Sequence, residues 1–121
     1  MIKAVIPVED CTSRLISPHF GRANYYMVYS IEDGEIKENE CMESPKYMNR
    51  RPGEYFADMG INLVLIPSGG GIGRRAVYAL RTKGIKVYVV DATTADEAIK
   101  KFVGGEAIEY TGEGCPGKNS I

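Results

Sequence analysis

The sequence has little of several residue types on which particular protein classes depend. Its 121 residues include no tryptophan, a single histidine and only three cysteines, which are an odd number at wide spacing. A framework of paired disulfides is therefore not expected. The pattern instead favours a protein of a reducing compartment. We predict a cytoplasmic protein whose free thiols are available for metal or redox chemistry.

Long apolar runs and an excess of charge of either sign are also absent. The apolar start at 1–8 is short and interrupted by Lys3, and no stretch approaches the roughly 20 apolar residues that span a bilayer. With 15 basic and 16 acidic residues, the chain has no global field that attracts nucleic acid or an anionic membrane. We expect neither as a partner, so electrostatic recognition should be local.

Apolar runs of strand length alternate with segments of helical periodicity. Nearly uninterrupted apolar residues are typical of parallel strands covered on both faces, and apolar positions three and four apart indicate helices. These patterns predict strands at 2–8, 25–31, 35–41, 61–67, 85–90 and 107–110, and helices at 52–59, 72–83 and 94–104. Long irregular loops are expected between the strands and helices of the first half.

The order of these elements predicts one three-layer α/β/α domain at 1–110 with a mixed sheet. Consecutive helix-to-strand units require right-handed crossovers and parallel neighbours, so the first strand and the two later buried strands should be parallel. Asp33-Gly34 is typical of a tight hairpin turn, which makes the strand before it antiparallel to the rest. Residues 111–121 are rich in glycine and polar residues and are expected to form a flexible tail.

The carboxyl ends of the parallel strands define the candidate site. Open α/β sheets bind ligands in the crevice at this edge. The loops that follow the strands there are 9–22, 68–73 and 91–94. We therefore expect the chemistry-bearing residues of these loops to gather in one place.

The glycine-rich turn at 68–73 is the candidate anion-binding element. Its backbone N–H groups would face an anion at the start of a helix, as those of phosphate loops do. A tight packing turn is the alternative, because the P-loop Lys-Ser/Thr and the third glycine of the dinucleotide fingerprint are missing. Arg74 and Arg75 favour an anion, since cations are unfavourable in a first helical turn, unless they simply extend into solvent. The predicted anion site comprises Arg22, Ser68, Gly69, Gly70, Gly71, Gly73 and Arg74.

Sulfur and imidazole donors are few, and they are the candidate metal ligands. Cys11 and His19 lie in the loop at 9–22, and Cys115 lies in the tail, none of them with zinc-finger spacing. His19 also has a structural interpretation, which its residue type alone favours: it fixes its loop by hydrogen bonds while Phe20 fills the core. Cys41, on the edge strand, is expected to take no part in the site.

Several segments together resemble the dinitrogenase iron-molybdenum cofactor biosynthesis family. They are the motif Ser-Pro-His-Phe-Gly-Arg-Ala at 17–23, the strand that follows it, and residues 60–67, 69–73, 84–85 and 94–104. The resemblance implies a ribonuclease H-like fold without that fold's catalytic carboxylates. It also implies a protein that carries an iron-sulfur or iron-molybdenum cofactor, or a precursor, for cofactor-assembly proteins.

We therefore predict a non-enzymatic carrier of an anionic iron-sulfur or iron-molybdenum-type cluster. Cys11, His19 and Cys115 would supply metal ligands, while arginines and glycine-turn amides hold the anionic periphery. One alternative is a small anion- or nucleotide-binding regulatory module that does not need Cys11. Another is an interaction domain that docks partners through the loop at 42–53 or through the tyrosines. A two-metal nuclease is not expected, because the first strand offers no carboxylate.

Overall fold

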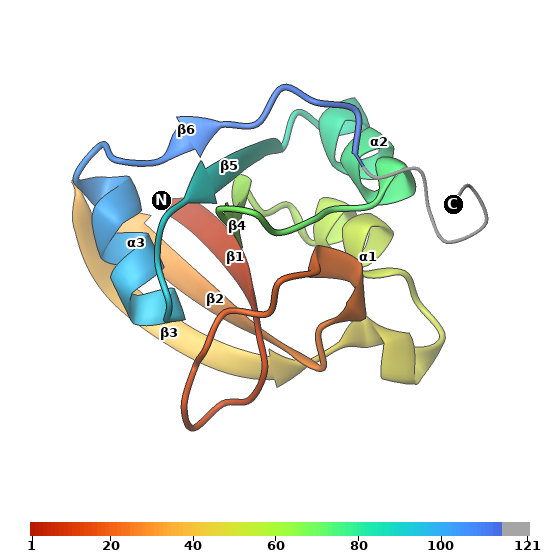
Figure 1. The fold of residues 1–121 in the computed structure, drawn as a ribbon, viewed down its shortest axis with the longest axis horizontal. Helices are drawn as coiled ribbons and strands as arrows, with labels where there is room; N and C mark the ends of the chain where they lie inside the picture. Colours follow the sequence, from red (N-terminus) through yellow and green to blue (C-terminus); the bar gives the residue numbers. More distant parts are fainter. Residues whose placement is uncertain (115–121) are drawn as a thin grey trace.

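The computed structural model describes residues 1–114, in which one six-stranded sheet lies between two layers of helices (Figure 1). The strand order is β3-β2-β1-β4-β5-β6. The elements are β1 (Ile2–Val8), η1 (Phe20–Arg22), β2 (Tyr25–Glu32), β3 (Glu35–Glu43), η2 (Pro45–Met48), α1 (Pro52–Met59), β4 (Leu63–Pro67), α2 (Arg74–Thr82), β5 (Lys86–Val90), α3 (Ala95–Val103) and β6 (Ile108–Glu109), where η denotes a 3-10 helix. No helix within 1–114 is long and apolar enough to cross a membrane.

The sheet is mixed, which confirms the predicted three-layer α/β class. β1, β4 and β5 are parallel, and β2 runs antiparallel to both β1 and β3. Only the strand before Asp33-Gly34, now β2, was expected to be antiparallel. In the structure β6 is antiparallel as well, because it pairs antiparallel with β5. The chain leaves α3 through Gly104 and Gly105, with φ of +82° at Gly105, and returns to the sheet without a crossover helix.

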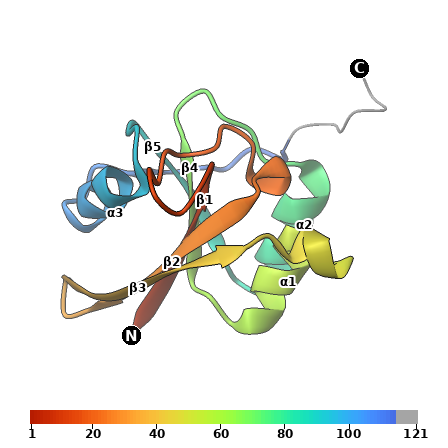
Figure 2. The ribbon, with the colours of Figure 1, turned by 90° about the horizontal axis from the view of Figure 1, so that it is seen from below.

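The two faces of the sheet pack against different helices, as Figure 2 shows. α1 and α2 cover one face, where the aromatic rings of Phe20, Tyr26 and Phe56 meet edge to face with centroids 4.9–6.2 Å apart. α3 covers the other face through Ala98 and Ile99. Each helix layer therefore buries its own apolar cluster against the same four strands, β2, β1, β4 and β5.

Local signals in the sequence set most of the turns and helix ends. Asp33 and Gly34 both have positive φ, at +54° and +76°, as a two-residue primed turn requires. Gly60 ends α1 in the left-handed conformation, with φ of +76°. The Thr94 hydroxyl accepts a hydrogen bond from the Glu97 backbone N–H at the start of α3, at 3.2 Å. These three predictions of local structure are confirmed.

Gly53 lies in the first turn of α1 and brings that helix against α2. A β-carbon at position 53 would lie 2.7 Å from the Ala76 Cα. Gly53→Ala should therefore separate the helices and lower the free energy of unfolding by about 1–3 kcal/mol, as measured by urea denaturation. Gly104→Ala is the control, because its nearest contact would be an ordinary 3.4 Å. Equal losses in the two variants would contradict a tight contact at Gly53.

Candidate functional site

The three predicted loops do gather at the carboxyl edge of β1, β4 and β5 (Figure 1). The loop after β1 forms an isolated bridge between Leu15 and Thr94, at the start of α3. The turn after β4 is tied to β5, because the Ser68 backbone N–H donates to the Val90 carbonyl at 3.0 Å. The parallel arrangement of the strands thus brings together segments that are far apart in the sequence.

A short parallel bridge joins the His19 segment to the glycine turn. The Gly71 N–H donates to the Pro18 carbonyl at 2.7 Å, and the Phe20 N–H donates to the Gly71 carbonyl at 2.9 Å. Gly70 makes this approach possible, because a β-carbon there would lie 2.6 Å from the Pro18 carbonyl oxygen. His19 and the glycine turn, two parts of the predicted site, are therefore direct neighbours.

Phe20 anchors the segment and leaves the His19 side chain at the surface. The Phe20 side chain is fully buried under α1, whereas His19 is exposed. The buried Tyr26 hydroxyl donates a hydrogen bond to the Phe20 carbonyl. Burial raises the pKa of the Tyr26 phenol far above its usual value, so the hydroxyl stays a donor. The structure thus places Phe20 in the core, as expected, and also presents the imidazole of His19 to solvent.

The glycine turn is not an open cradle of amides. Besides Ser68 and Gly71, the Gly70 N–H also has a partner, the Pro67 carbonyl at 2.9 Å. Gly69 has a φ of +78°, which the turn at 67–70 requires. The expectation that all these amides face an anion is corrected: the Ser68 and Gly71 amides bond to neighbouring segments, and the Gly70 amide closes its own turn. The helix α2 begins at Arg74, two residues later than predicted. Its N-cap residue is Gly73, which has no side chain to cap the helix.

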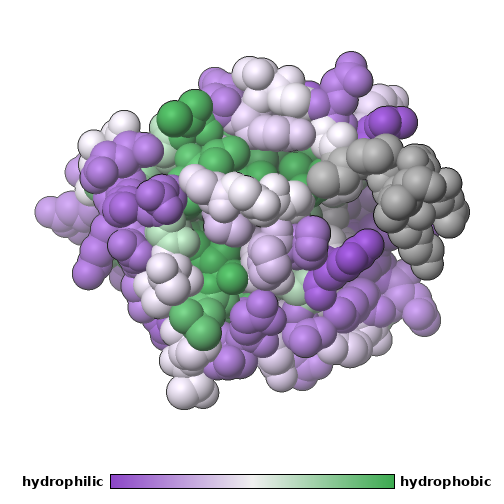
Figure 3. Space-filling model, in the orientation of Figure 1, coloured by the Kyte–Doolittle hydropathy of each residue, from purple (hydrophilic) through white to green (hydrophobic). Residues whose placement is uncertain are grey.

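The arginines singled out in the sequence are exposed: Arg74 and Arg75 lie in the first turn of α2, and Arg22 lies in η1. Within residues 1–114, Arg22, Arg74 and Arg75 form no ion pair, whereas Arg14 and Arg50 pair with Asp96 and Asp58 respectively. Figure 3 shows hydrophilic residues around the rim of this face and a hydrophobic band through its centre. Positive charge without a paired carboxylate is what an anionic ligand needs.

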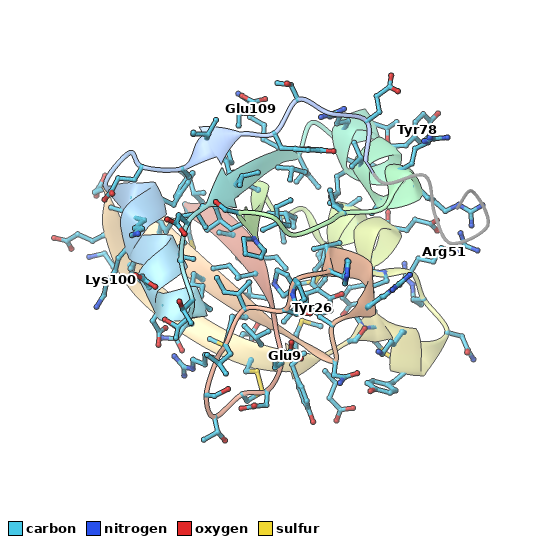
Figure 4. The ribbon with its side chains drawn as sticks, viewed as in Figure 1. Glu9, Tyr26, Arg51, Tyr78, Lys100 and Glu109 are labelled. Atoms are coloured by element: carbon cyan, nitrogen blue, oxygen red, sulfur yellow. A yellow bond between two sulfur atoms is a disulfide. The ribbon has the colours of Figure 1, made fainter. Side chains whose placement is uncertain are left out.

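Arg51 is a further cation at this edge and was not among the predicted site residues. It is exposed, forms no ion pair within 1–114, and lies at the N-cap of α1. Because Gly53 packs on Ala76, α1 and α2 begin side by side, and Figure 4 shows Arg51 on the same side of the molecule as the start of α2. The sequence did contain a sign of this residue: Arg51 directly precedes Pro52, which is typical of a helix start. The helix macrodipole disfavours a cation at that position.

Cys11 does not offer a free thiol, contrary to the prediction. Its sulfur is bonded to that of Cys41, and the two Cα atoms are 5.7 Å apart. The wide spacing of the cysteines along the chain was misleading, because the loop after β1 folds back to the edge strand β3. Cys41, which was expected to take no part in chemistry, is therefore a disulfide partner.

The neighbours of Cys11 and of His19 pack on different faces of the sheet. Cys41 and Ile16 pack with the α3-side cluster, whereas Phe20, next to His19, packs with the cluster under α1 and α2. Cys115 lies outside the described residues. Among residues 1–114, no three His, Cys, Asp or Glu side chains are grouped to hold a metal ion. Of the two predicted metal ligands within residues 1–114, only His19 lies beside the glycine turn.

A groove of about 480 Å³ runs along the outer side of α2. It is lined by Arg74, Val77, Tyr78, Arg81, Thr82 and Glu113. Tyr78 is 72% exposed, and Gly114 lies against the Arg74 backbone. The described end of the chain thereby reaches the predicted anion site, and Arg74 is common to the groove and that site.

Comparisons with known proteins agree with this fold. Residues 1–105 match the family described as dinitrogenase iron-molybdenum cofactor. The uncharacterized protein MJ0580 of Methanocaldococcus jannaschii is 32% identical over 115 residues, which are 91% of this chain and 92% of that protein. The crystal structure of PH0822 is similar with a TM-score of 0.73 and 31% identity, covering 91% of this chain and 96% of that one. The apo orange protein of Desulfovibrio gigas has a TM-score of 0.73 at 22% identity, covering 96% and 98%, and supports the fold alone.

The contact at Gly70 is expected to hold His19 in place. Gly70→Ala would force a β-carbon into the Pro18 carbonyl and the Pro67 ring, at 2.6 and 2.8 Å. We expect a loss of about 1–3 kcal/mol in stability and a clear shift of the ring-proton NMR signals of the single histidine. Gly73→Ala, where nothing lies within 4 Å of the added carbon, should leave these signals in place. If the His19 signals stay in place in Gly70→Ala, the position of His19 does not depend on the contact at Gly70.

Proposed function

This chain belongs to the dinitrogenase iron-molybdenum cofactor family, and from that premise we propose that it is a non-enzymatic carrier of an iron-sulfur or iron-molybdenum-type cofactor or precursor. The observation that supports the proposal most is the bridge between the His19 segment and Gly71. It joins an exposed imidazole to an edge rich in cations. In this proposal the protein is cytoplasmic and exchanges its cargo with cofactor-assembly proteins.

The donor set favours holding a preassembled anionic cofactor over building a cluster. Iron-sulfur clusters are usually ligated by several cysteine thiolates, whereas Cys11 and Cys41 are joined in a disulfide. One imidazole can take a single metal position, and exposed guanidinium groups can bind sulfide, carboxylate or oxo groups at the periphery. Such a site binds its cargo through few bonds, which suits release to another protein.

Each group has a defined task in this proposal. His19 supplies the one metal-ligating side chain at the edge, while Arg22 and Arg74 hold the anionic periphery. Arg51 adds positive charge from the start of α1. Cys11 has no ligand role in this proposal, because its sulfur is bonded to that of Cys41. Cys115, outside the described residues, remains a predicted ligand.

Anaerobic loading tests this proposal directly. The protein is incubated with ferrous iron and sulfide, with and without molybdate, desalted, and examined by visible absorption and metal analysis. We expect a coloured, metal-containing protein, and a tenfold or greater loss of affinity in His19→Ala, since even outer-shell changes cost about 10–100-fold.

Matched arginine variants separate site contacts from general charge. Arg22→Gln and Arg74→Gln should each weaken binding by roughly tenfold, because a charge-assisted hydrogen bond contributes about 1.5–3 kcal/mol. Lys100→Gln removes an equal charge from exposed α3 on the other face and should leave binding unchanged. A colourless, metal-free wild type, or equal loss in all three variants, would contradict the carrier function.

The groove beside α2 supports a second candidate, a nucleotide- or small-anion-binding module. Exposed Tyr78 could stack on a base, while Arg74 and Arg81 line the same groove and could reach phosphates. A nucleotide at a hundred times its dissociation constant would add about 2.7 kcal/mol to stability, which thermal-shift screening detects. Tyr78→Ala should abolish the shift, and Tyr47→Ala, at another exposed tyrosine, should preserve it. Stabilisation by nucleotides without uptake of iron would favour this alternative.

A further inference from the structure

We propose that Cys11 and Cys41 form a reversible thiol–disulfide couple, a redox-modification site separate from the cofactor site. The two residues are 30 positions apart in the sequence and are bonded across the loop after β1 and the edge strand β3. They lie on the α3 side of the sheet, whereas the His19 segment packs toward α1. The couple therefore adds a property that the carrier function does not require.

The two sulfurs differ in exposure to solvent, and this difference decides which of them a reductant attacks in thiol–disulfide exchange. Cys11 lies in an exposed loop, and Cys41 is half-buried against the α3-side cluster. Exchange requires a thiolate to reach one sulfur of the disulfide. An incoming reductant therefore attacks at Cys11, and Cys41 is the leaving group.

The chemical step is an exchange with an external dithiol. One thiolate of the dithiol bonds to the Cys11 sulfur while the S–S bond breaks, and the electron pair leaves on the Cys41 sulfur, which takes a proton from water. The second thiolate of the dithiol then attacks its own mixed-disulfide sulfur and displaces the Cys11 thiolate, which is also protonated. The dithiol is oxidised to a disulfide, and the protein gains two thiols.

The backbone at Cys11 is held by contacts that do not involve its sulfur. The Asp10 carboxylate accepts hydrogen bonds from the Thr12 and Ser13 N–H groups, at 2.9 and 2.7 Å. These bonds lower the pKa of Asp10, with the Ser13 N–H contributing most, so the turn persists at neutral pH. The Glu9 N–H also donates to the Leu15 carbonyl at 2.8 Å, which closes the base of the loop.

The backbone at Cys41 is held as firmly by the sheet. Cys41 pairs with Met27 in a regular part of the β2–β3 ladder. The one shift in register lies between Ser30 and Ile31, nearer the hairpin turn. Because both partners keep their positions without the S–S bond, reduction leaves two neighbouring thiols and not an open loop. The same geometry favours closure again under oxidising conditions.

The contacts between Cys11 and His19 should isolate the two sites from each other. The bridges of Leu15 to Thr94 and of Ile16 to Val8 lie between them in the chain, and the Ser17 N–H donates to the Pro7 carbonyl at 2.9 Å. Reduction should therefore lower stability, because a cross-link is lost, without moving His19. The expected fall in Tm is on the order of 10 °C.

Thiol counting tests the couple, in a Cys115→Ser background so that only Cys11 and Cys41 are counted. Maleimide labelling read by mass spectrometry should add no label to the air-oxidised protein and two after dithiothreitol. Oxidised glutathione should return the reduced protein to no label, with the mass of a monomer. Two free thiols in the air-oxidised protein, or reoxidation only to cross-linked dimers, would overturn the proposal.

Single-cysteine variants test the direction of attack, and histidine NMR tests the separation. Cys41→Ser leaves the exposed Cys11, which should label faster than Cys41 does in Cys11→Ser; the reverse order would overturn attack at Cys11. The ring signals of His19 should stay in place on reduction. A shift as large as that expected for Gly70→Ala would overturn the independence of the two sites. None of these measurements requires metal, so they stand apart from the loading experiment.

Discussion

The approach of the His19 segment to the glycine turn is the contact on which the site depends. Two backbone hydrogen bonds at Gly71 make it, and the missing side chain of Gly70 permits it. Phe20 then locks the segment into the core under α1. Glycine at this turn is therefore required first for close packing of backbone on backbone, and the candidate binding surface is what this packing leaves exposed: an imidazole and the nearby arginines.

Most of the fold could be predicted because its signals are local. Buried strands, helix periodicity, the Asp33-Gly34 turn, Gly60 and the Thr94 cap each act within a few residues, and the crossover rule then orders the parallel strands. β6 was expected as a short strand parallel to the others, whereas it pairs antiparallel with β5, because its two residues carry too little pattern to set a direction. Gathering of the loops at one edge followed from the parallel strands alone.

The site was predicted less completely, because its details depend on contacts between distant segments. Amides at Ser68, Gly70 and Gly71 look available in the sequence, and only the fold reveals the carbonyls of Val90, Pro67 and Pro18 that accept from them. The Cys11–Cys41 pairing likewise depends on a loop that folds back on β3, which no spacing rule reports. The carboxyl-edge position of Arg51 required the packing of α1 on α2.

The hydroxyl of Tyr26 gives this architecture one more property. Burial raises the pKa of the Tyr26 phenol far above its usual value, so the hydroxyl keeps its proton at neutral pH and its bond to the Phe20 carbonyl does not depend on ionisation there. The scaffold beneath His19 is thus a fixed mechanical support and not an ionisable one. Acid–base behaviour of any ligand complex at this edge would then reflect the ligand and the residues that touch it, with the support beneath them unchanged.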